Sequence, residues 1–154
     1  MNDRGTYTES QVILTAVRII APFTITYGLF LALHGADTPG GSFQGGAIIG
    51  VTFLMIAFAF GIEATRDWIP NGIVAGMVTG GVAIFIGVGL ATIVLGGNFL
   101  EYRMFETVLN IPDGTKWGME AIEVGGIAAI VAGVVITLFF ATAAAYIPHE
   151  EEAP

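Results

Sequence analysis

Three residue types that carry hydrolytic chemistry lie close together in one short polar segment of this chain. His34, Asp37 and Ser42 fall within nine positions, and a histidine, a carboxylate and a hydroxyl are the groups of a nucleophilic triad. The serine stands in Gly-Gly-Ser-Phe-Gln and lacks the Gly-x-Ser-x-Gly elbow that exposes a nucleophile. Phosphate-loop, dinucleotide-binding and His-Glu-x-x-His zinc motifs are also absent from the sequence. We therefore expect a protein that is not an enzyme and that holds no cofactor or catalytic metal.

The elements that hold these residues follow from where the charged residues fall. The 154-residue chain is 55% hydrophobic and 12% charged, and its mean hydropathy is +0.80. Four stretches lack Asp, Glu, Lys and Arg, namely 19–36, 38–62, 68–100 and 124–148. A membrane-spanning helix needs about 20 apolar residues, so each stretch has room for one. We expect an all-α integral membrane protein, a single domain over 1–154, with helices near 12–33, 46–62, 73–95 and 122–147.

The charge balance excludes some partners and orients the chain. Five basic residues against 13 acidic ones, a net charge of -8, cannot form the basic surface that a nucleic-acid binder needs. The acidic excess lies outside the predicted helices. Four crossings put both termini on one side, where Arg4, Arg18 and Arg66 outnumber Arg103 and Lys116 on the other. This bias predicts a multi-pass protein of the cell membrane with cytoplasmic termini.

The segment 34–46, which joins the first two predicted helices, is unusual for its glycines. It holds five glycines and one proline, and we expect such a run not to form regular helix. It is either a tight Pro-Gly turn or a structured loop buried at a subunit contact or a hydrated passage, because irregular backbone at membrane depth needs its polar groups satisfied. The residues expected to shape this loop are Pro39, Gly40, Gly41, Phe43, Gly45 and Gly46.

A longer connection, 96–121, separates the third and fourth predicted helices. It alternates apolar and charged residues and contains Pro-Asp-Gly at 112–114. We expect a short interfacial helix here, interrupted at this tripeptide.

Titratable side chains near the ends of the predicted helices are candidates for an ion pathway. Glu63 and Glu123 are either solvated helix-end carboxylates or, if drawn inward, relay groups for protons or cations. Asp37 and His34 complete this set of candidates. Arg18 in the first helix either extends to the membrane surface or pairs with an acid on another helix.

Small residues at four-residue spacing predict close helix packing. Gly72, Gly76 and Gly80 form such a row in the third predicted helix, and Gly125 and Gly133 flank Ala129 in the fourth. Rows of this kind let two helix backbones approach each other within a membrane. The partner helix is either part of this chain or part of another subunit, and so many small faces favour additional membrane subunits as partners.

The run His34-Gly-Ala-Asp-Thr-Pro-Gly-Gly-Ser-Phe-Gln-Gly-Gly46, placed after an apolar helix, resembles the signature of the MnhB/MrpB family. This family comprises the MnhB or MrpB subunits of Mrp-type multisubunit sodium/proton antiporters and has relatives in membrane-bound hydrogenase complexes. The family pattern is His-Gly-x-x-x-Pro-Gly-Gly-Gly-Phe-x-Gly-Gly, so Ser42 replaces its third glycine. The resemblance extends to chain length, the four-helix layout and the glycine-rich later helices.

The resemblance implies a small subunit of a complex that exchanges protons for sodium or another monovalent cation. Large subunits of such complexes carry a lysine and glutamate relay, and this chain has no lysine within its predicted helices. The implied role is assembly with other membrane subunits, with a share in an ion route between subunits left open. The alternative is a structural membrane-anchor subunit of a hydrogenase-like or related redox complex.

Overall fold

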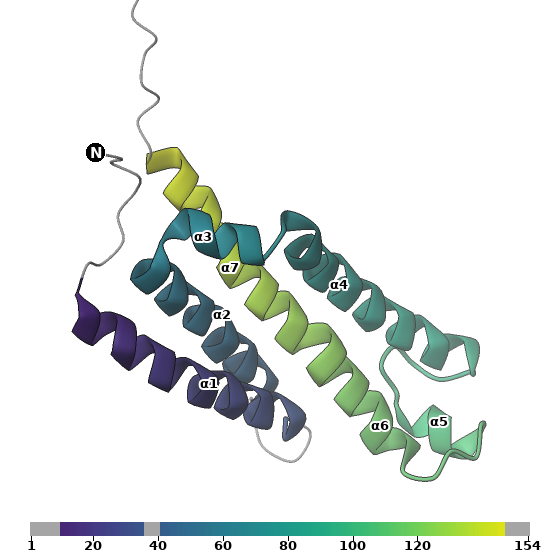
Figure 1. Cartoon of the computed structure of the whole chain (residues 1–154). Coiled ribbons are helices and arrows are strands. Elements are labelled where there is room, and N and C mark those ends of the chain that lie inside the picture. Colours follow the sequence, from purple (N-terminus) through teal and green to yellow (C-terminus); the bar gives the residue numbers. More distant parts are fainter. Residues whose placement is uncertain (1–9, 36–40, 147–154) are drawn as a thin grey trace, which may run out of the picture.

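The computed structural model of the protein describes residues 10–35 and 41–146, and within this part of the chain it contains helices and no strands. Asp37, Pro39 and Gly40 of the predicted loop lie outside the described residues. The helices, labelled in Figure 1, are α1 (Gln11–Leu33), α2 (Gly41–Phe60), α3 (Ile62–Trp68), α4 (Asn71–Val94), α5 (Arg103–Thr107), α6 (Gly114–Glu120), a π-helical segment η1 (Ala121–Ala128) and α7 (Ala129–Tyr146).

Four stretches are long and apolar enough to cross a membrane, which confirms the all-α fold with four spans. They are Gln11–Leu33, Gly41–Phe60, Asn71–Val94 and Gly114–Ala144. The last one contains α6, η1 and most of α7 in one continuous helix. It therefore begins eight residues before the predicted start at 122, and its first turns carry Lys116 and Glu120 3.8 Å apart. Such a pair at i,i+4 spacing is compatible with a helix, so these charges do not mark a loop.

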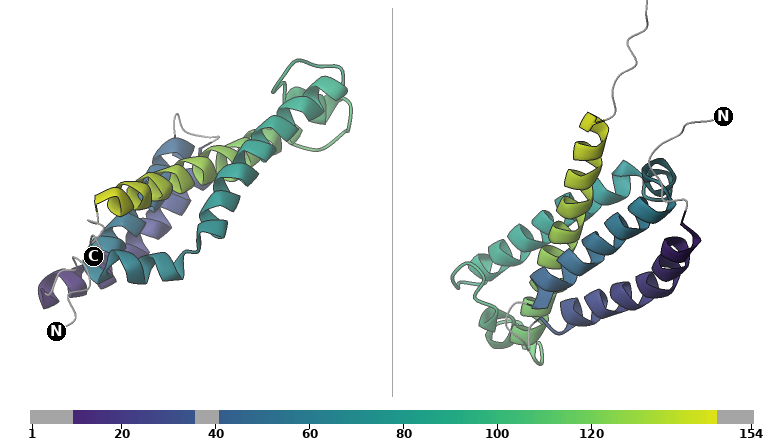
Figure 2. Two further views of the ribbon diagram at one scale, coloured as in Figure 1. Left: turned by 90° about the horizontal axis from the view of Figure 1, so that it is seen from above. Right: turned by 90° about the vertical axis from the view of Figure 1, so that its left-hand side faces the viewer.

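The spans lie side by side in the order α1, α2, α7, α4 (Figure 1). Helix α1 packs on α2, α2 on α7 and η1, and α4 on the other side of α7 and η1, so α1 and α4 form the two edges. The start of α1 and the end of α7 lie at the end of the bundle that also holds α3. Helix α5 and the 95–113 connection lie at the opposite end (Figure 2). Large apolar side chains such as Phe23 and Phe43, 72% and 60% exposed, point away from the chain, as expected beside lipid.

The prediction that the 34–46 run cannot form regular helix is wrong for its second half. Gly41, Phe43, Gly45 and Gly46 lie in the first turns of α2. Glycine weakens a helix by about 1 kcal/mol compared with alanine. At Gly45 this loss is offset by packing, because the backbones of α1 and α2 come so close that a Cβ there would lie 2.6 Å from a carbonyl oxygen of α1.

The glycines predicted to pack helices divide into two groups. Gly125 lies against Ile84 of α4, and Gly133 lies against the same helix, where a Cβ would approach the side chain of Val78 to 2.7 Å. The row Gly72, Gly76 and Gly80 has the opposite environment, since nothing in the described chain lies within 4 Å of where their Cβ atoms would be. This row therefore packs on no helix of the described chain, and packing against another subunit stays a prediction.

Candidate functional site

Of the three described titratable residues predicted for an ion pathway, Glu63 lies at the opposite end of the bundle from His34 and Glu123. Asp37 lies outside the described residues, and Glu63 is exposed on α3, at the end of the bundle that holds the start of α1 and the end of α7. His34 caps α1 at the opposite end, and Glu123 lies in η1. Among the described members of this set, Glu123 lies within a membrane-spanning stretch, Gly114–Ala144.

Glu123 occupies the third position of the π-helical segment η1, Ala121–Ala128. The carboxylate oxygen Oε2 of Glu123 is buried. Segment η1 also contacts α4 closely, because a Cβ at Gly81 would lie 2.8 Å from the carbonyl oxygen of Gly126. π-Helical turns inside α-helices are frequent at functional sites, where they change the direction in which a side chain points. The segment thus combines a non-standard backbone with a partly buried carboxylate.

Three elements converge at this carboxylate. A Cβ added to Gly35, just after α1, would overlap Oγ of Ser42 at the start of α2 and would lie 2.5 Å from Oε2 of Glu123. Both oxygens are therefore within a few ångströms of the same point. We call Gly35, Ser42 and Glu123 the Glu123 cluster. It needs a glycine at position 35, because any side chain there would occupy the space that the two oxygens share.

Ser42 is the least solvated member of the cluster. The residue is 4% exposed, and its Oγ has no hydrogen-bond partner among the described residues. A buried hydroxyl without a partner costs roughly 1–3 kcal/mol, so it calls for a physical explanation.

Tyr102 lies against the cluster from the 95–113 connection, outside the membrane-spanning stretches. Its ring packs on Gly118 of α6, where a Cβ would lie 2.8 Å from the ring. Burial, and then the negative charge of Glu123, raise the pKa of the Tyr102 phenol above its ordinary value of 10.0. The phenol is therefore neutral at ordinary pH, at the end of the bundle where the polar connection lies.

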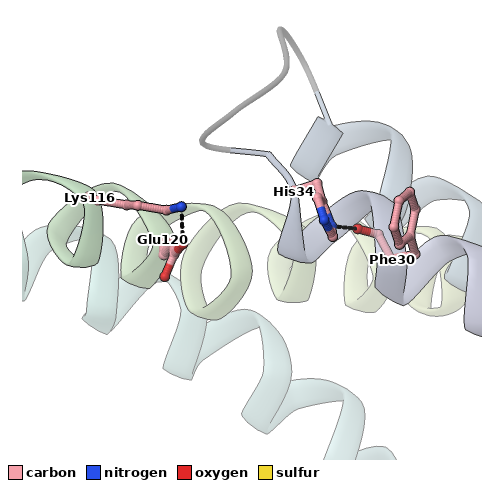
Figure 3. A network of polar contacts seen from close by, with 4 residues as sticks. All are labelled: Phe30, His34, Lys116 and Glu120. Atoms are coloured by element: carbon pink, nitrogen blue, oxygen red, sulfur yellow. Dashed lines mark hydrogen bonds and ion pairs between the residues drawn. The ribbon is translucent and has the colours of Figure 1, made fainter. Parts of the chain in front are cut away.

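His34 and Lys116 make local contacts near this end of the bundle (Figure 3). Nδ1 of His34 lies 2.9 Å from the carbonyl oxygen of Phe30, and the two rings stack with centroids 4.2 Å apart. Lys116 forms its ion pair with Glu120 one turn further along the same helix. The structure thus places the His34 ring on the last turn of α1.

Arg18 lies at the opposite end of the bundle from the Glu123 cluster. Its guanidinium carbon is 5.4 Å from the centre of the Phe60 ring, the last residue of α2. The side chain is exposed and forms a cation–π contact, and no ion pair of Arg18 occurs among the described residues, so of the two alternatives the pair with an acid is not seen there.

Sequence reasoning identifies Glu123 as a candidate but misses its surroundings. It rejects Ser42 as a nucleophile and notes it as a departure from the family pattern, but it does not place Ser42, Gly35 or Tyr102 beside Glu123. The replacement of the third glycine of the family pattern by Ser42 is a usable signal. Nothing local marks Tyr102, because its position depends on how the 95–113 connection folds back onto α6.

Comparisons with known proteins point to one family of membrane-transport subunits. Residues 12–137 match the family model "Domain related to MnhB subunit of Na+/H+ antiporter". The chain is 23% identical over 138 residues to a Na(+)/H(+) antiporter subunit of Bacillus subtilis (strain 168), covering 90% of this chain and 94% of that protein. Two staphylococcal relatives carry the name antiporter subunit mnhB2. The relative from Staphylococcus aureus (strain MRSA252) is 29% identical, and the match covers 68% of this chain and 72% of that protein. The relative from Staphylococcus saprophyticus is 27% identical, and the match covers 84% of this chain and 92% of that protein.

The matched range begins inside α1 and ends inside α7, so it takes in parts or all of the four spanning stretches. It also contains each member of the Glu123 cluster. The chain therefore belongs to the family of domains related to the MnhB subunit of Na+/H+ antiporters.

Proposed function

We propose that this chain is a small membrane subunit of a multisubunit Na+/H+ antiporter. The observation that carries the proposal is the family match over 12–137, supported by relatives that are named as antiporter subunits. The relatives' names support this function over the redox-complex alternative. The protein is then a component of a transporter rather than an enzyme, and it lies in the cell membrane with its termini in the cytoplasm.

Two features support a role in assembly with other membrane subunits. Helix α4 is at one edge of the bundle and leaves Gly72, Gly76 and Gly80 open, which is the kind of face that another membrane helix packs against. The apolar side chains exposed along the spans fit a protein surrounded by lipid and by partner helices.

A share in ion movement is the second part of the proposal, and Glu123 is its candidate group. Ionisable residues within membrane spans are costly and are typical of ion and proton pathways. Asp37 is the second candidate, because it lies between Gly35 and α2 in sequence.

The test has two parts, assembly and transport. The tagged chain, extracted in mild detergent, should co-purify with antiporter subunits, and co-purification with redox subunits in their place would overturn the proposal. In everted membrane vesicles, Glu123→Gln and Asp37→Asn should each lower Na+/H+ antiport while the complex still assembles. Glu120→Gln is the matched control, because this carboxylate lies one turn earlier on the same helix and pairs with Lys116. If both variants show antiport at the level of the control, the ion-movement part of the proposal is wrong and only the assembly role remains.

A further inference from the structure

The buried hydroxyl of Ser42 is the feature that the proposed function does not explain. Ser42 is 4% exposed. Its Oγ has no hydrogen-bond partner within the described chain and lies close to the buried Oε2 of Glu123. The two oxygens come from different helices and meet over Gly35, where the chain has no side chain. A buried hydroxyl oxygen close to a buried carboxylate oxygen supplies two oxygen atoms of the kind that hold a hard cation.

The donor set selects the class of cation. Carboxylate and hydroxyl oxygens are ligands for hard cations, and divalent Ca²⁺ or Mg²⁺ sites usually draw on more than one carboxylate. Among the described residues, no three His, Cys, Asp or Glu side chains gather where they could hold a metal ion. Within the described residues the cluster contributes one carboxylate, that of Glu123, which balances one positive charge and so favours a monovalent cation.

The ends of two helices suit such an ion pair. Gly35 follows the last residues of α1, whose carbonyl end carries partial negative charge, and Ser42 is the second residue of α2, whose amide end carries partial positive charge. The amide end of α2 stabilises the Glu123 carboxylate, and the carbonyl end of α1 stabilises a cation beside it. Sodium sites in membrane transporters use helix ends in this way.

We infer that the Glu123 carboxylate and the Ser42 hydroxyl hold one partly dehydrated Na+, and that a proton competes for the same carboxylate. This rests on the proposed function, since it names the ion that the candidate pathway binds. When Na+ enters, the neutral carboxyl group releases its proton to water and the resulting carboxylate binds the ion. When a proton returns, Na+ leaves.

Several other titratable groups lie on the elements that carry or contact the cluster. Tyr102 faces Glu123 from the 95–113 connection, and Lys116 and Glu120 occupy the preceding turns of the same helix. His34 is next to Gly35 and contacts Phe30. These groups are unchanged in all the variants below, so a difference between two variants reports on the substituted residue.

Protection from a carbodiimide tests the inference directly. Dicyclohexylcarbodiimide modifies protonated carboxyl groups in apolar surroundings, and the modified Glu123 peptide is measured by mass spectrometry. The experiment uses membranes that contain the complete complex, at fixed pH, with NaCl replacing choline chloride. We expect Glu123 to be modified without Na+ and protected as Na+ increases, and we expect higher pH to lower the Na+ concentration that half-protects it.

The variants separate the Na+ ligand from the proton site. Ser42→Ala should raise the half-protecting Na+ concentration by about tenfold, the effect of losing one hydroxyl contact to a charged group. Gly35→Ala should abolish protection, because its Cβ would take the space between the oxygens. The matched control for Ser42→Ala is Thr52→Val, which removes a buried hydroxyl of α2 that already donates to the Ile48 carbonyl oxygen at 2.7 Å. This control should be protected as in the unchanged chain.

Four results would overturn the inference: no modification of Glu123 at any pH, modification insensitive to Na+, protection equal in KCl, or a Ser42→Ala response matching that of Thr52→Val. Antiport and co-purification measured on the same membranes keep the two proposals apart. A complex that exchanges Na+ and protons while Glu123 fails these tests would overturn the site and leave the proposed function standing. A complex without antiport activity would count against the proposed function whatever the labelling shows.

Discussion

Substituting Gly45 by alanine should separate α1 from α2. The added Cβ would lie 2.6 Å from the carbonyl oxygen of Gly28 and 2.7 Å from the backbone nitrogen of Ala32. Carbon–oxygen contacts ordinarily begin near 3.3 Å, so the overlap is roughly 0.7 Å. Both obstructing atoms belong to the backbone, so no change of side-chain rotamer can relieve the overlap, and the two helices must move apart.

The size of the effect follows from comparison with Gly76→Ala. Overpacking a well-packed contact costs about 1–3 kcal/mol. Replacing a helical glycine by alanine restores about 1 kcal/mol of helix propensity. Gly76 lies inside α4 with nothing within 4 Å of its Cβ position, so its variant gains the propensity without the overlap. Because the propensity contribution is common to both, the difference between the two variants isolates the packing cost, about 1–3 kcal/mol.

The assay is unfolding of the purified chain by sodium dodecyl sulfate in mixed micelles, followed by circular dichroism. We expect Gly76→Ala to unfold at the same or a higher detergent fraction than the unchanged chain, and Gly45→Ala at a clearly lower one. Equal midpoints for the two variants would refute the close α1–α2 contact, and with it the explanation of why α2 begins inside a glycine-rich run.

Three further predictions concern other contacts. Thr92 is fully buried and its hydroxyl lies 2.8 Å from the Asn98 carbonyl oxygen, so Thr92→Val should lower the free energy of unfolding by about 1–2 kcal/mol in the same assay. Arg18→Gln should cost about 0.5–1 kcal/mol by removing the cation–π contact at the end of α2, and Arg18→Lys should retain part of it. Because burial and Glu123 raise the folded-state pKa of Tyr102 above 10.0, its contribution to stability is full below pH 10 and is lost as the pH rises through the folded pKa. Glu123→Gln should lower the pKa of Tyr102. This pKa is measured from the phenolate absorbance during a pH titration, and the titration of Tyr102→Phe identifies the contribution of Tyr102.

The number and approximate position of the spans could be predicted because the membrane imposes a length and excludes charge. The errors in the predicted helix boundaries share a physical cause. Contacts between helices determine where a helix begins, even where the local residue types predict a loop. Glycine's weak propensity suggests a loop at Gly45, yet the absence of a side chain is what lets α1 pack there. Charged residues suggest a connection at Lys116, yet its pairing with Glu120 leaves the helix intact.

The candidate site was predictable only in part, for a related reason. A carboxylate next to a long apolar stretch is visible in the sequence, so Glu123 could be singled out. Its π-helical backbone has no local signature, and its closeness to Ser42 depends on the end of α1 and the start of α2 meeting η1 at Gly35. Residues that are distant in sequence form the site, and no spacing rule along the chain connects them.

The glycine rows show what spacing alone can and cannot determine. Gly133, in a row at four-residue spacing, lies on a central helix with neighbours on two sides, and its row is filled by α4. Gly76 has the same spacing, but α4 is an edge helix that uses its other face for α7 and η1. Four-residue spacing therefore predicts that a helix can be approached closely, while the position of the helix in the bundle decides whether this chain makes that approach. The open row on α4 is consistent with a partner from outside the chain, which is where the proposed antiporter assembly would place one.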